Sequence, residues 1–355
     1  MGGMQRVSMQ LSQQLTLNDD VQLVEITQET GWKNIGVKTT FFLLRLLFRL
    51  PAFVRKEKPD LILFSSLVTG CMGYFLRKRI SIPMVSISHG HDVTLKVGAY
   101  QWLLRRMLQN LDAVISVSTA TQKECLSRGL AEHKSVVLPN GFDMQDLQTP
   151  YSKKQARQLL EKEFGLRLGN RPLLLTVGRL IKRKGHRWFI DEVLPRVQTE
   201  AVYMVIGDGA EKAAIMQSVS KSDKKANIVL TGRQPDEILE MAYTAADLFI
   251  MPNVKVDGDM EGFGVVLLEA NLRKTPAIAS NIEGIRDVIS QGRNGYRIKA
   301  GDAAGFAKKI DDVLLTELET LSQESRFYVK HQFSWEKVAK EYIKFLGGLV
   351  LPPPK

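Results

Sequence analysis

The chain has 355 residues, of which 44% are hydrophobic and 25% are charged, with 27 glycines and 13 prolines. This composition is typical of a globular protein and excludes a disordered, collagen-like or disulfide-stapled class. At roughly 150 residues per domain, the length predicts about two domains. No apolar run reaches the roughly 20 residues of a membrane-spanning helix, and the opening MGGMQRVSMQ lacks the apolar region of a signal peptide.

The net charge of +11 is spread over both halves, with 17 basic against 12 acidic side chains in residues 1–150 and 32 against 26 in the rest. Basic chains suit anionic partners such as nucleic acid, an anionic membrane or phosphorylated small molecules. Nucleic acid is not expected, because the chain has no zinc-finger spacing, basic arm or aromatic cluster. The only cysteines, Cys71 and Cys125, have no metal-ligand spacing, so we expect reduced thiols and a cytoplasmic location.

Short apolar segments alternate with amphipathic helical segments along the first half of the chain. The strands are continuous apolar runs, which is typical of parallel strands buried on both faces. The expected helices are 4–17, 39–56, 99–110 and 119–128, and the expected strands are 21–27, 61–66, 83–89, 113–118 and 135–139.

The second half repeats this alternation about every 25 residues, which indicates βαβ units. The expected strands are 173–178, 203–207, 228–232, 248–252, 276–280 and 295–298. Eleven strands in all exceed the roughly six of one doubly wound sheet. We therefore predict an α/β protein with two Rossmann-like domains.

The domain boundary is predicted near Asn140-Gly141, a turn dipeptide. We expect an N-terminal domain over residues 1–145, a C-terminal domain over 146–330, and a last helix with its tail over 331–355.

The two ends of the chain carry further signals. Ser334 suits the N-cap of the last helix, which is expected to run to about Leu346, because the prolines of the tail cannot continue it. A doubly wound domain normally begins with a strand, whereas this sequence begins with Gly2-Gly3 directly before a helix. We expect that the first strand is missing from this sequence or that the true start lies upstream; the alternative is a domain that does without this strand.

The most informative stretch is DMEGFGVVLLEA, residues 259–270, which follows an expected strand and opens an expected helix. Its glycines let the backbone approach a ligand, and a helix N-terminus favours phosphate. Glu261 is expected just ahead of the helix and Glu269 two turns along it, roughly 12 Å apart. That distance matches the span from a ribose across a diphosphate to a hexose. The alternative is two solvated glutamates.

A second candidate is VGRLIKRKG, residues 177–185, which places four cations within six residues after an expected strand. The carboxyl ends of strands form the ligand side of open α/β sheets. There an arginine fork and a lysine point charge suit a diphosphate. The alternative is a solvated basic loop.

A third candidate is SHGHD, residues 88–92, again directly after an expected strand. His89, beside a glycine, suggests a ligand contact. The two histidines with Asp92 could also suggest a metal, but no further His or Cys completes a ligand set. A plain loop histidine is the remaining alternative. Residues 207–209 and 231–233 are common strand-to-helix turns.

Together and in this order, the Glu-x7-Glu pair, the Gly-Arg-Leu…Lys-Gly loop, the His-Gly-x-Asp turn, the Leu-Pro-Asn-Gly linker and the initial Gly-Gly strongly resemble the family-4 retaining glycosyltransferases of the GT-B fold. The resemblance covers essentially the whole chain. It implies two Rossmann-like domains whose parallel sheets face a central cleft, with the last helix crossing back to the N-terminal domain. It also implies a nucleotide diphosphate sugar bound mainly by the C-terminal domain.

The resemblance further implies roles for single residues. Arg179 and Lys184 would neutralise the diphosphate leaving group in place of a metal, so neither a metal nor a cofactor is expected. Glu261 and the amides of residues 262–264 would hold the sugar hydroxyls, His89 would contact the sugar or the reacting centre, and Glu269 would hold the ribose. The other implied donor-binding residues are Gly2, Gly3, Gly178, Arg233 (near the base), Gly262, Phe263, Gly264 and Val265.

The implied reaction transfers a hexose with retention onto a glycan or lipid-linked acceptor, giving an α-glycosidic bond in surface polysaccharide, lipopolysaccharide or glycolipid synthesis. Residues 259–264 are similar to a mannosyltransferase subset, which points to GDP-mannose, and a UDP-sugar is an equal alternative. A GT-B epimerase or phosphorylase and a non-catalytic nucleotide-sugar-binding protein are the competing functions. The missing first strand departs from the family, because Gly2-Gly3 normally border the diphosphate.

Two local patterns have alternative interpretations. Residues 257–259 have the spacing of a D-x-D metal motif, but we interpret them as a loop beside the Glu-x7-Glu helix. The apolar segment 40–51 carries Arg45 and Arg49 on one face. It is either a core-packing helix or a helix that lies on an anionic membrane surface. Further basic side chains nearby are Arg55, Lys56, Lys58, Arg77, Lys78, Arg79, Arg105 and Arg106.

Overall fold

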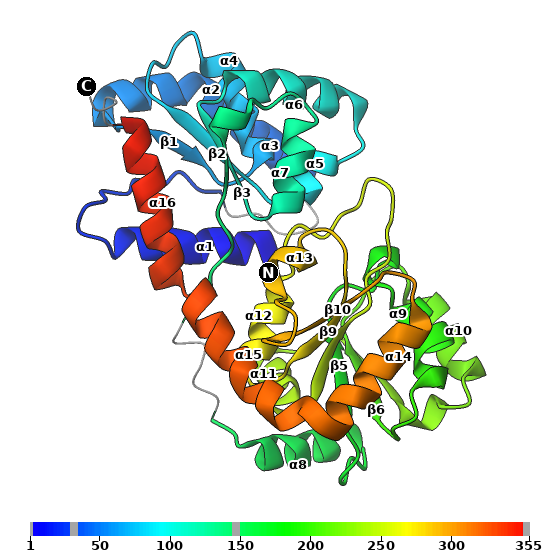
Figure 1. The fold of residues 1–355 in the computed structure, drawn as a ribbon. Helices are drawn as coiled ribbons and strands as arrows, with labels where there is room; N and C mark the ends of the chain where they lie inside the picture. Colours follow the sequence, from blue (N-terminus) through cyan, green and yellow to red (C-terminus); the bar gives the residue numbers. More distant parts are fainter. Residues whose placement is uncertain (1–2, 29–34, 144–149, 351–355) are drawn as a thin grey trace. The chain divides into compact units, whose positions relative to one another are not determined.

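The computed structural model of the chain describes residues 3–28, 35–143 and 150–350 (Figure 1). It divides into two compact α/β units, each with its own parallel sheet. The N-terminal unit comprises Met1–Gly141 together with Trp335–Lys355, and the C-terminal unit comprises Phe142–Ser334. Among the described residues, no helix is both long and apolar enough to cross a membrane.

The sheet of the N-terminal unit has four parallel strands in the order β1-β2-β3-β4. All residues of β2 and β3 are buried, as their continuous apolar sequences predict. The strands are β1 (Ile62–Phe64), β2 (Met84–Ser88), β3 (Ala113–Ser116) and β4 (Ser135–Val137). The helices are α1 (Gly3–Thr16), α2 (Ile35–Glu57), α3 (Leu67–Gly70), α4 (Met72–Leu76), α5 (His91–Thr94), α6 (Gly98–Asn110), α7 (Thr119–Leu126) and α16 (Trp335–Val350).

The strand expected at 21–27 is wrong, because this segment has no strand structure and Val24 and Ile26 are exposed. A strand needs a neighbouring backbone to complete its hydrogen-bond ladder. Among the described residues, no strand pairs with this segment, and β1 pairs only with β2. The described part of the chain therefore contains ten of the eleven expected strands.

Helix α16 belongs to the N-terminal unit although it follows the whole of the other unit in sequence. It packs beside α1, and Figure 1 shows the two helices in contact. Trp335, at its start, is buried, and its indole donates a hydrogen bond to Gln10 Oε1 at 3.2 Å. The helix extends four residues beyond the expected end at Leu346, to Val350.

The sheet of the C-terminal unit has six parallel strands in the order β10-β9-β8-β5-β6-β7. The strands are β5 (Leu173–Val177), β6 (Val202–Ile206), β7 (Ile228–Gly232), β8 (Leu248–Met251), β9 (Ala277–Ser280) and β10 (Gly295–Ile298). The helices are α8 (Lys153–Phe164), α9 (His186–Trp188), α10 (Lys212–Lys221), α11 (Asp236–Ala245), α12 (Val265–Leu272), α13 (Ile285–Val288), α14 (Ala303–Asp312) and α15 (Leu318–Phe333).

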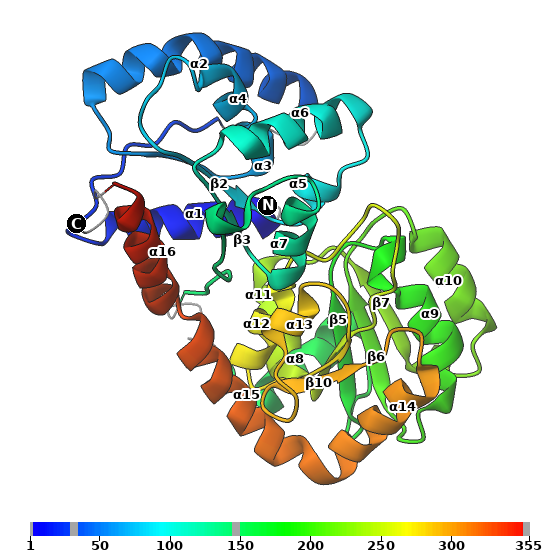
Figure 2. The ribbon, with the colours of Figure 1, turned by 45° about the horizontal axis from the view of Figure 1, so that its top comes forward.

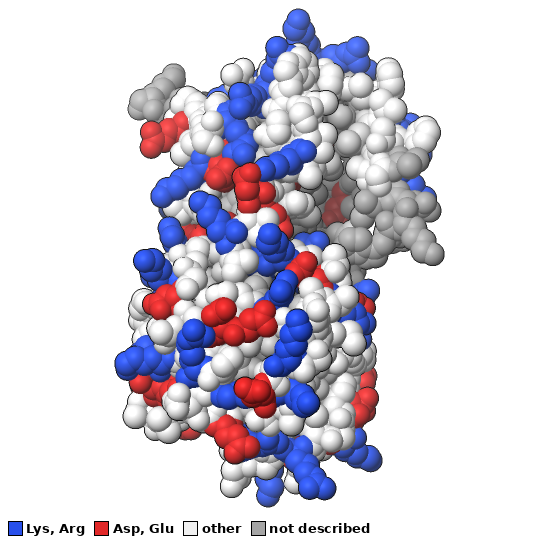
Figure 3. Space-filling view, turned by 90° about the vertical axis from the view of Figure 1, so that its right-hand side faces the viewer, with Lys and Arg blue, Asp and Glu red and all other residues white. Residues whose placement is uncertain are grey.

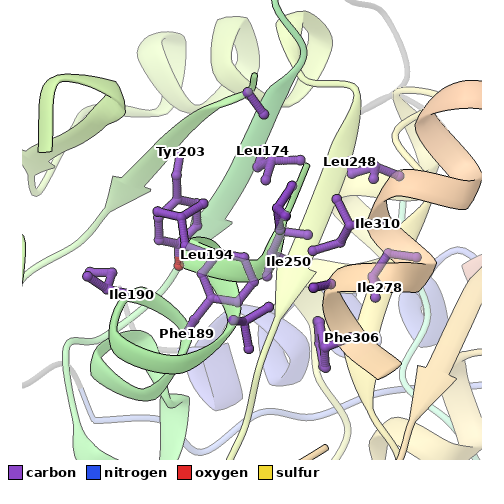
Figure 4. Packing of buried hydrophobic residues seen from close by; sticks show 14 of the residues in the cluster. Leu174, Phe189, Ile190, Leu194, Tyr203, Leu248, Ile250, Ile278, Phe306 and Ile310 are labelled. Carbon is purple, nitrogen blue, oxygen red and sulfur yellow. The ribbon is translucent and has the colours of Figure 1, made fainter. Parts of the chain in front are cut away.

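One hydrophobic cluster holds helices against the sheet of the C-terminal unit (Figure 4). Leu174, Leu248 and Ile250 come from adjacent strands, and Phe189 and Phe306 pack over them from helical segments. These side chains are fully buried, and burial of each large apolar side chain contributes about 1.5–3 kcal/mol to the free energy of unfolding. The cluster fixes the strands whose carboxyl ends carry the candidate site.

Candidate functional site

The chain direction across the C-terminal sheet reverses between β5 and β8. Strands β5, β6 and β7 follow one another in one direction, whereas β8, β9 and β10 run from β5 in the other. The connections after β5 and β8 therefore leave toward opposite sides, and a crevice opens at the carboxyl ends of these two strands. Both predicted motifs of this unit, the basic loop and the Glu-x7-Glu segment, follow these two strands.

Glycines bring the basic loop 178–185 close to the neighbouring strand ends. At Gly185, φ is +67°, and a β-carbon there would lie 2.0 Å from the carbonyl oxygen of Pro252. The Val254 amide donates to the Arg183 carbonyl at 2.9 Å, which fixes the loop beside the end of β8. Only glycine allows this approach, because any side chain would collide with the backbone of Pro252.

Three side chains converge on one carboxylate oxygen of Glu261. Lys184 Nζ lies 2.6 Å from Oε2, Asn253 Nδ2 donates to the same oxygen at 2.9 Å, and the Arg183 guanidinium also donates to it. The Arg183 Nε also donates to Asp259 Oδ1 at 3.0 Å. Glu261, Arg183 and Asn253 are buried, so the alternative of two solvated glutamates is wrong for Glu261.

The charges around Glu261 control its protonation. Burial by itself would raise the pKa of this carboxyl, but the Lys184 and Arg183 cations outweigh burial and lower its pKa to about 2. The neighbouring carboxyl of Glu283 accepts a hydrogen bond from the Glu261 amide, and burial raises the pKa of Glu283. Glu261 is thus a carboxylate at neutral pH, held by two cations and an amide.

The helix that follows begins later than the sequence predicts. Gly264, with φ of +92°, precedes α12, which starts at Val265, so Glu261 lies four residues before the helix. Glu269 is therefore about one turn along α12 rather than two, which corrects its expected place in the helix, while the expected 12 Å spacing stays a prediction. Its Oε2 accepts a hydrogen bond from the Tyr243 hydroxyl at 2.8 Å.

The two glycines before α12 pack closely against a neighbouring loop. A β-carbon at Gly284 would lie 2.1 Å from the Gly262 carbonyl oxygen, and the Gly284 amide donates to the Glu261 carbonyl at 3.1 Å. Phe263 is buried against Phe333 of α15. The Leu267 amide donates to the Gly264 carbonyl at 2.9 Å, and the positive end of the helix dipole makes this end of α12 suited to bind an anion.

The sequence matches two family models that between them cover most of the chain. Residues 1–146 match the model described as Glycosyltransferase Family 4, and residues 171–316 match the model described as Glycosyl transferases group 1. The chain belongs to the family-4 glycosyltransferases.

Curated relatives match this chain over most of their own length. The N-acetyl-alpha-D-glucosaminyl L-malate synthase of Bacillus anthracis is 26% identical over 317 residues, which are 84% of this chain and 77% of the relative. The GDP-mannose-dependent alpha-(1-6)-phosphatidylinositol monomannoside mannosyltransferase of Mycobacterium tuberculosis is 25% identical over 273 residues, or 75% and 69% of the two chains.

The fold is also that of a solved structure. HepE of Anabaena, crystallised in complex with UDP, superposes with a TM-score of 0.74 at 18% identity, over 86% of this chain and 82% of HepE. The two parallel sheets of this glycosyltransferase are therefore those of the GT-B fold, as predicted.

The basic loop divides into buried and exposed cations. Arg183 is buried and Lys184 is largely buried beside Glu261, whereas Arg179 and Lys182 are exposed. A β-carbon at Gly178 would lie 4.0 Å from Lys184 Nζ, so the lysine amine is adjacent to the carboxyl end of β5. The alternative of a solvated basic loop is therefore wrong for half of its cations.

The remaining predicted residue of this unit is more distant from the Glu261 cluster. Arg233 is exposed in the turn after β7, at the edge of the sheet and three strands away from β8. The structure does not bring its side chain to the carboxylates, and a contact with the base stays a prediction.

His89 lies in the N-terminal unit, directly after β2. It is buried, its Nε2 is 2.9 Å from the Ser65 carbonyl oxygen, and its amide donates to Asp92 Oδ1 at 2.9 Å. The second oxygen of Asp92 accepts from the Leu67 amide at 3.1 Å. Asp92 thus joins the loops after β1 and β2, and both of its oxygens are engaged, which argues against the metal alternative for residues 88–92.

The expected contact of Gly2 and Gly3 with the diphosphate stays a prediction. Gly2 lies outside the described residues, and Gly3 is the first residue of α1.

Sequence reasoning missed three residues of the Glu261 cluster: Arg183, Asn253 and Glu283. Arg183 was visible as one of four cations, but nothing in the sequence distinguishes the buried cation from the exposed Lys182 beside it. Asn253 is fully buried directly after β8 and Pro252. A polar residue at the carboxyl end of a buried strand is the signal that could have identified it.

Proposed function

We propose that this glycosyltransferase is a retaining, metal-independent hexosyltransferase. In this proposal it transfers a hexose from a UDP- or GDP-sugar to a glycan or lipid-linked acceptor and forms an α-glycosidic bond. The product would belong to a surface polysaccharide, lipopolysaccharide or glycolipid. The reaction would take place at the cytoplasmic side of the cell membrane and would need no cofactor.

The observation that carries the proposal is the buried cluster of Glu261, Lys184 and Arg183 where the sheet reverses direction. Lys184 has three N–H donors, of which Glu261 takes one, so others can bind a diphosphate oxygen. Exposed Arg179 supplies a second cation from the same loop. Such preorganised cations stabilise the charge that develops on a leaving diphosphate.

The two oxygens of Glu261 have different roles in this proposal. Oε2 accepts from Lys184, Arg183 and Asn253, whereas among the described residues no group donates to Oε1. Oε1 is therefore the atom that would accept a hydrogen bond from a sugar hydroxyl. The anionic state of Glu261, with its pKa lowered to about 2, makes that bond strong at neutral pH.

The names of similar proteins support the proposed classes of donor and acceptor. The mycobacterial relative is named for a GDP-mannose donor and a phosphatidylinositol mannoside acceptor, and HepE was crystallised with UDP. These names favour a nucleotide diphosphate sugar as donor. The mycobacterial name also favours a lipid-linked acceptor, whereas the Bacillus anthracis relative is named for L-malate.

The proposal is tested by measuring UDP or GDP release and sugar transfer with a panel of nucleotide sugars. We expect one donor class to turn over, and Arg179→Ala and Lys184→Ala each to lower the rate by about two orders of magnitude or more. NMR of the product should show an α-anomer. If a nucleotide sugar binds without any turnover, the competing non-catalytic function is correct instead.

Metal independence has its own test. Asp259, the second acid of the D-x-D spacing, pairs with Arg183 at 3.0 Å, which supports our interpretation of residues 257–259 as a loop. Activity should therefore survive excess EDTA. A complete loss of activity that Mn²⁺ restores would show that these aspartates bind metal.

A further inference from the structure

The outer helix layer of the N-terminal unit exposes large apolar side chains that its sheet does not cover. Helix α4 packs between α2 and α6, and Figures 1 and 2 show these three helices along one side of the sheet, with α1 on the other. Phe41 and Phe48 of α2 are 69% and 73% exposed, and Leu44 is half-exposed. Phe75 of α4 and Trp102 of α6 are also exposed.

Basic and apolar side chains share the outward face of α2. Phe41 and Phe48 are seven residues apart and lie on the same side of the helix. Arg45 follows Phe41 by four residues and precedes Phe48 by three, so it lies between the two rings. Both Arg45 and Arg49 are exposed. A core-packing helix would bury these phenylalanines, so that interpretation of segment 40–51 is wrong for its outward face.

The charge on this layer has one sign. Helix α2 contains no acidic residue before Glu57, and α4 and α6 contain none. On α6 the Arg106 guanidinium stacks on the Trp102 ring at 3.8 Å. Figure 3 shows Lys and Arg side chains along the upper edge of the view, over the N-terminal unit, with uncharged side chains between them.

One of the expected basic residues does not contribute to this surface. Arg77 makes a bidentate ion pair with Asp112 at 2.8 and 3.0 Å, so its charge is neutralised within the unit. Lys78 and Arg79 beside it are exposed.

The geometry points to an anionic lipid surface as the partner of this layer, with the side chains of Phe41, Phe48 and Trp102 in the acyl boundary and Arg45, Arg49 and Arg106 on the headgroups. Aromatic rings flanked by arginines on one helix face are typical of helices that lie in the membrane interface. A second copy of the chain fits poorly, because two such basic faces repel each other. The inference deepens the proposed function, since it assigns the membrane contact to a surface that the donor-binding residues do not use.

The test is co-sedimentation of the full chain with vesicles of phosphatidylcholine alone or mixed with phosphatidylglycerol, at low and high salt. We expect binding only to the anionic vesicles and weaker binding as salt rises, because salt screens the headgroup charge. Arg45→Gln with Arg49→Gln should lower the partition coefficient about 30-fold, which corresponds to about 1 kcal/mol per cation. Phe41→Ser with Phe48→Ser should lower it at least about tenfold.

Matched variants in the other unit control for general effects of charge and exposure. Phe327→Ser removes an exposed ring of α15, and Arg187→Gln with Arg196→Gln removes two exposed arginines. These variants should bind vesicles as the parent does. Turnover of the donor in solution should stay at the parental rate in every variant, so a failed glycosyltransferase assay and a failed docking assay are distinguishable.

Three results would overturn the inference. They are equal binding to neutral and anionic vesicles, no binding at low salt, and unchanged binding of the Phe41/Phe48 variant. A concentration-dependent dimer that the same variant dissociates, without lipid binding, would identify a second copy as the partner instead.

Discussion

Arg183 is the more buried of the two cations that contact Glu261. Its guanidinium is almost completely buried and contacts the carboxylates of both Asp259 and Glu261. A buried ion pair adds little net stability over an apolar pair, but removal of one partner leaves an uncompensated charge. We therefore predict that Arg183 positions Glu261.

Arg183→Gln should destabilise the protein strongly. We expect a loss of about 3–5 kcal/mol in the free energy of unfolding, because Glu261 and Asp259 keep their charges without this partner. Arg187→Gln is the matched control, since that arginine is exposed and pairs with the exposed carboxylate of Asp191 one turn away. It should change stability by less than about 0.5 kcal/mol. Urea unfolding measures both values, and equal stabilities of the two variants would contradict the positioning role.

Acid should destabilise the chain in two separate pH windows. Burial lowers the pKa of His186 to about 4, so stability should fall as the pH decreases from about 6.5 toward 4, because unfolding lets this histidine take up a proton. The pKa of Glu261 is lowered from 4.5 to about 2, so its contribution is present above pH 4.5 and is lost toward pH 2.

Glu261→Gln separates the two contributions. The variant should reduce the loss of stability below pH 4.5 and leave the loss between pH 6.5 and 4 in place, measured as the unfolding free energy in urea across the pH range. Its kcat should fall, whereas Glu269→Gln should mainly weaken donor binding, because the ribose is remote from the reacting bond. The reverse kinetic pattern would exchange the roles of the two glutamates.

At the scale of elements, the loop between β5 and α9 places Arg183 and Lys184. Its last residue, Gly185, has a left-handed conformation and touches the carbonyl of Pro252 at the end of β8. The Lys182–Lys184 segment is a single 3-10 turn, and its tight winding directs Arg183 inward and leaves Lys182 exposed.

Gly185→Ala should therefore inactivate the enzyme, and Gly165→Ala should not. Both glycines have positive φ, +67° and +63°, so both variants lose about 1 kcal/mol of stability from the backbone conformation. Only at Gly185 does the new β-carbon collide with another strand end, while at Gly165 it meets open space. We expect a roughly 100-fold lower kcat for Gly185→Ala, since the loop must shift by about 1 Å. Parental activity of that variant would show that the position of the loop is unimportant.

At the scale of the whole molecule, the chain completes its first unit with its last helix. Trp335 begins α16, packs against the Gly141 backbone and bonds to Gln10 of α1. The N-terminal unit thus needs residues from both ends of the sequence, whereas the C-terminal unit is a continuous segment.

Trp335→Ala should destabilise only the N-terminal unit. Loss of a buried tryptophan costs about 3–5 kcal/mol, which is about 10 °C in Tm for a unit of this size. Calorimetry with and without UDP or GDP measures the effect. The nucleotide should raise the transition of the C-terminal unit, and the substitution should lower the other one. If Trp335→Ala instead lowers the Tm of the transition that the nucleotide raises, the assignment of Trp335 to the N-terminal unit is contradicted.

The sequence by itself determined the elements that depend on local patterns. The strands β5, β6 and β8 are continuous apolar runs, and α16 begins directly after Ser334, so periodicity and a helix-start signal were sufficient to place them. The glycines before α12 and the cations after β5 likewise predicted an anion site from sequence alone, and the structure places both segments after the adjacent strands β8 and β5.

Only the tertiary structure decided features that depend on distant neighbours. Segment 21–27 has an amino-acid composition typical of a strand, but it pairs with no strand among the described residues. Phe41 is an apolar residue of the kind found in protein cores, but it is exposed. Arg183 and Lys182 are chemically similar neighbours, yet only Arg183 meets Asp259 and Glu261. Strand pairing, burial and ion pairs depend on residues that are far apart in the chain. A local sequence pattern therefore cannot predict which residue becomes the partner.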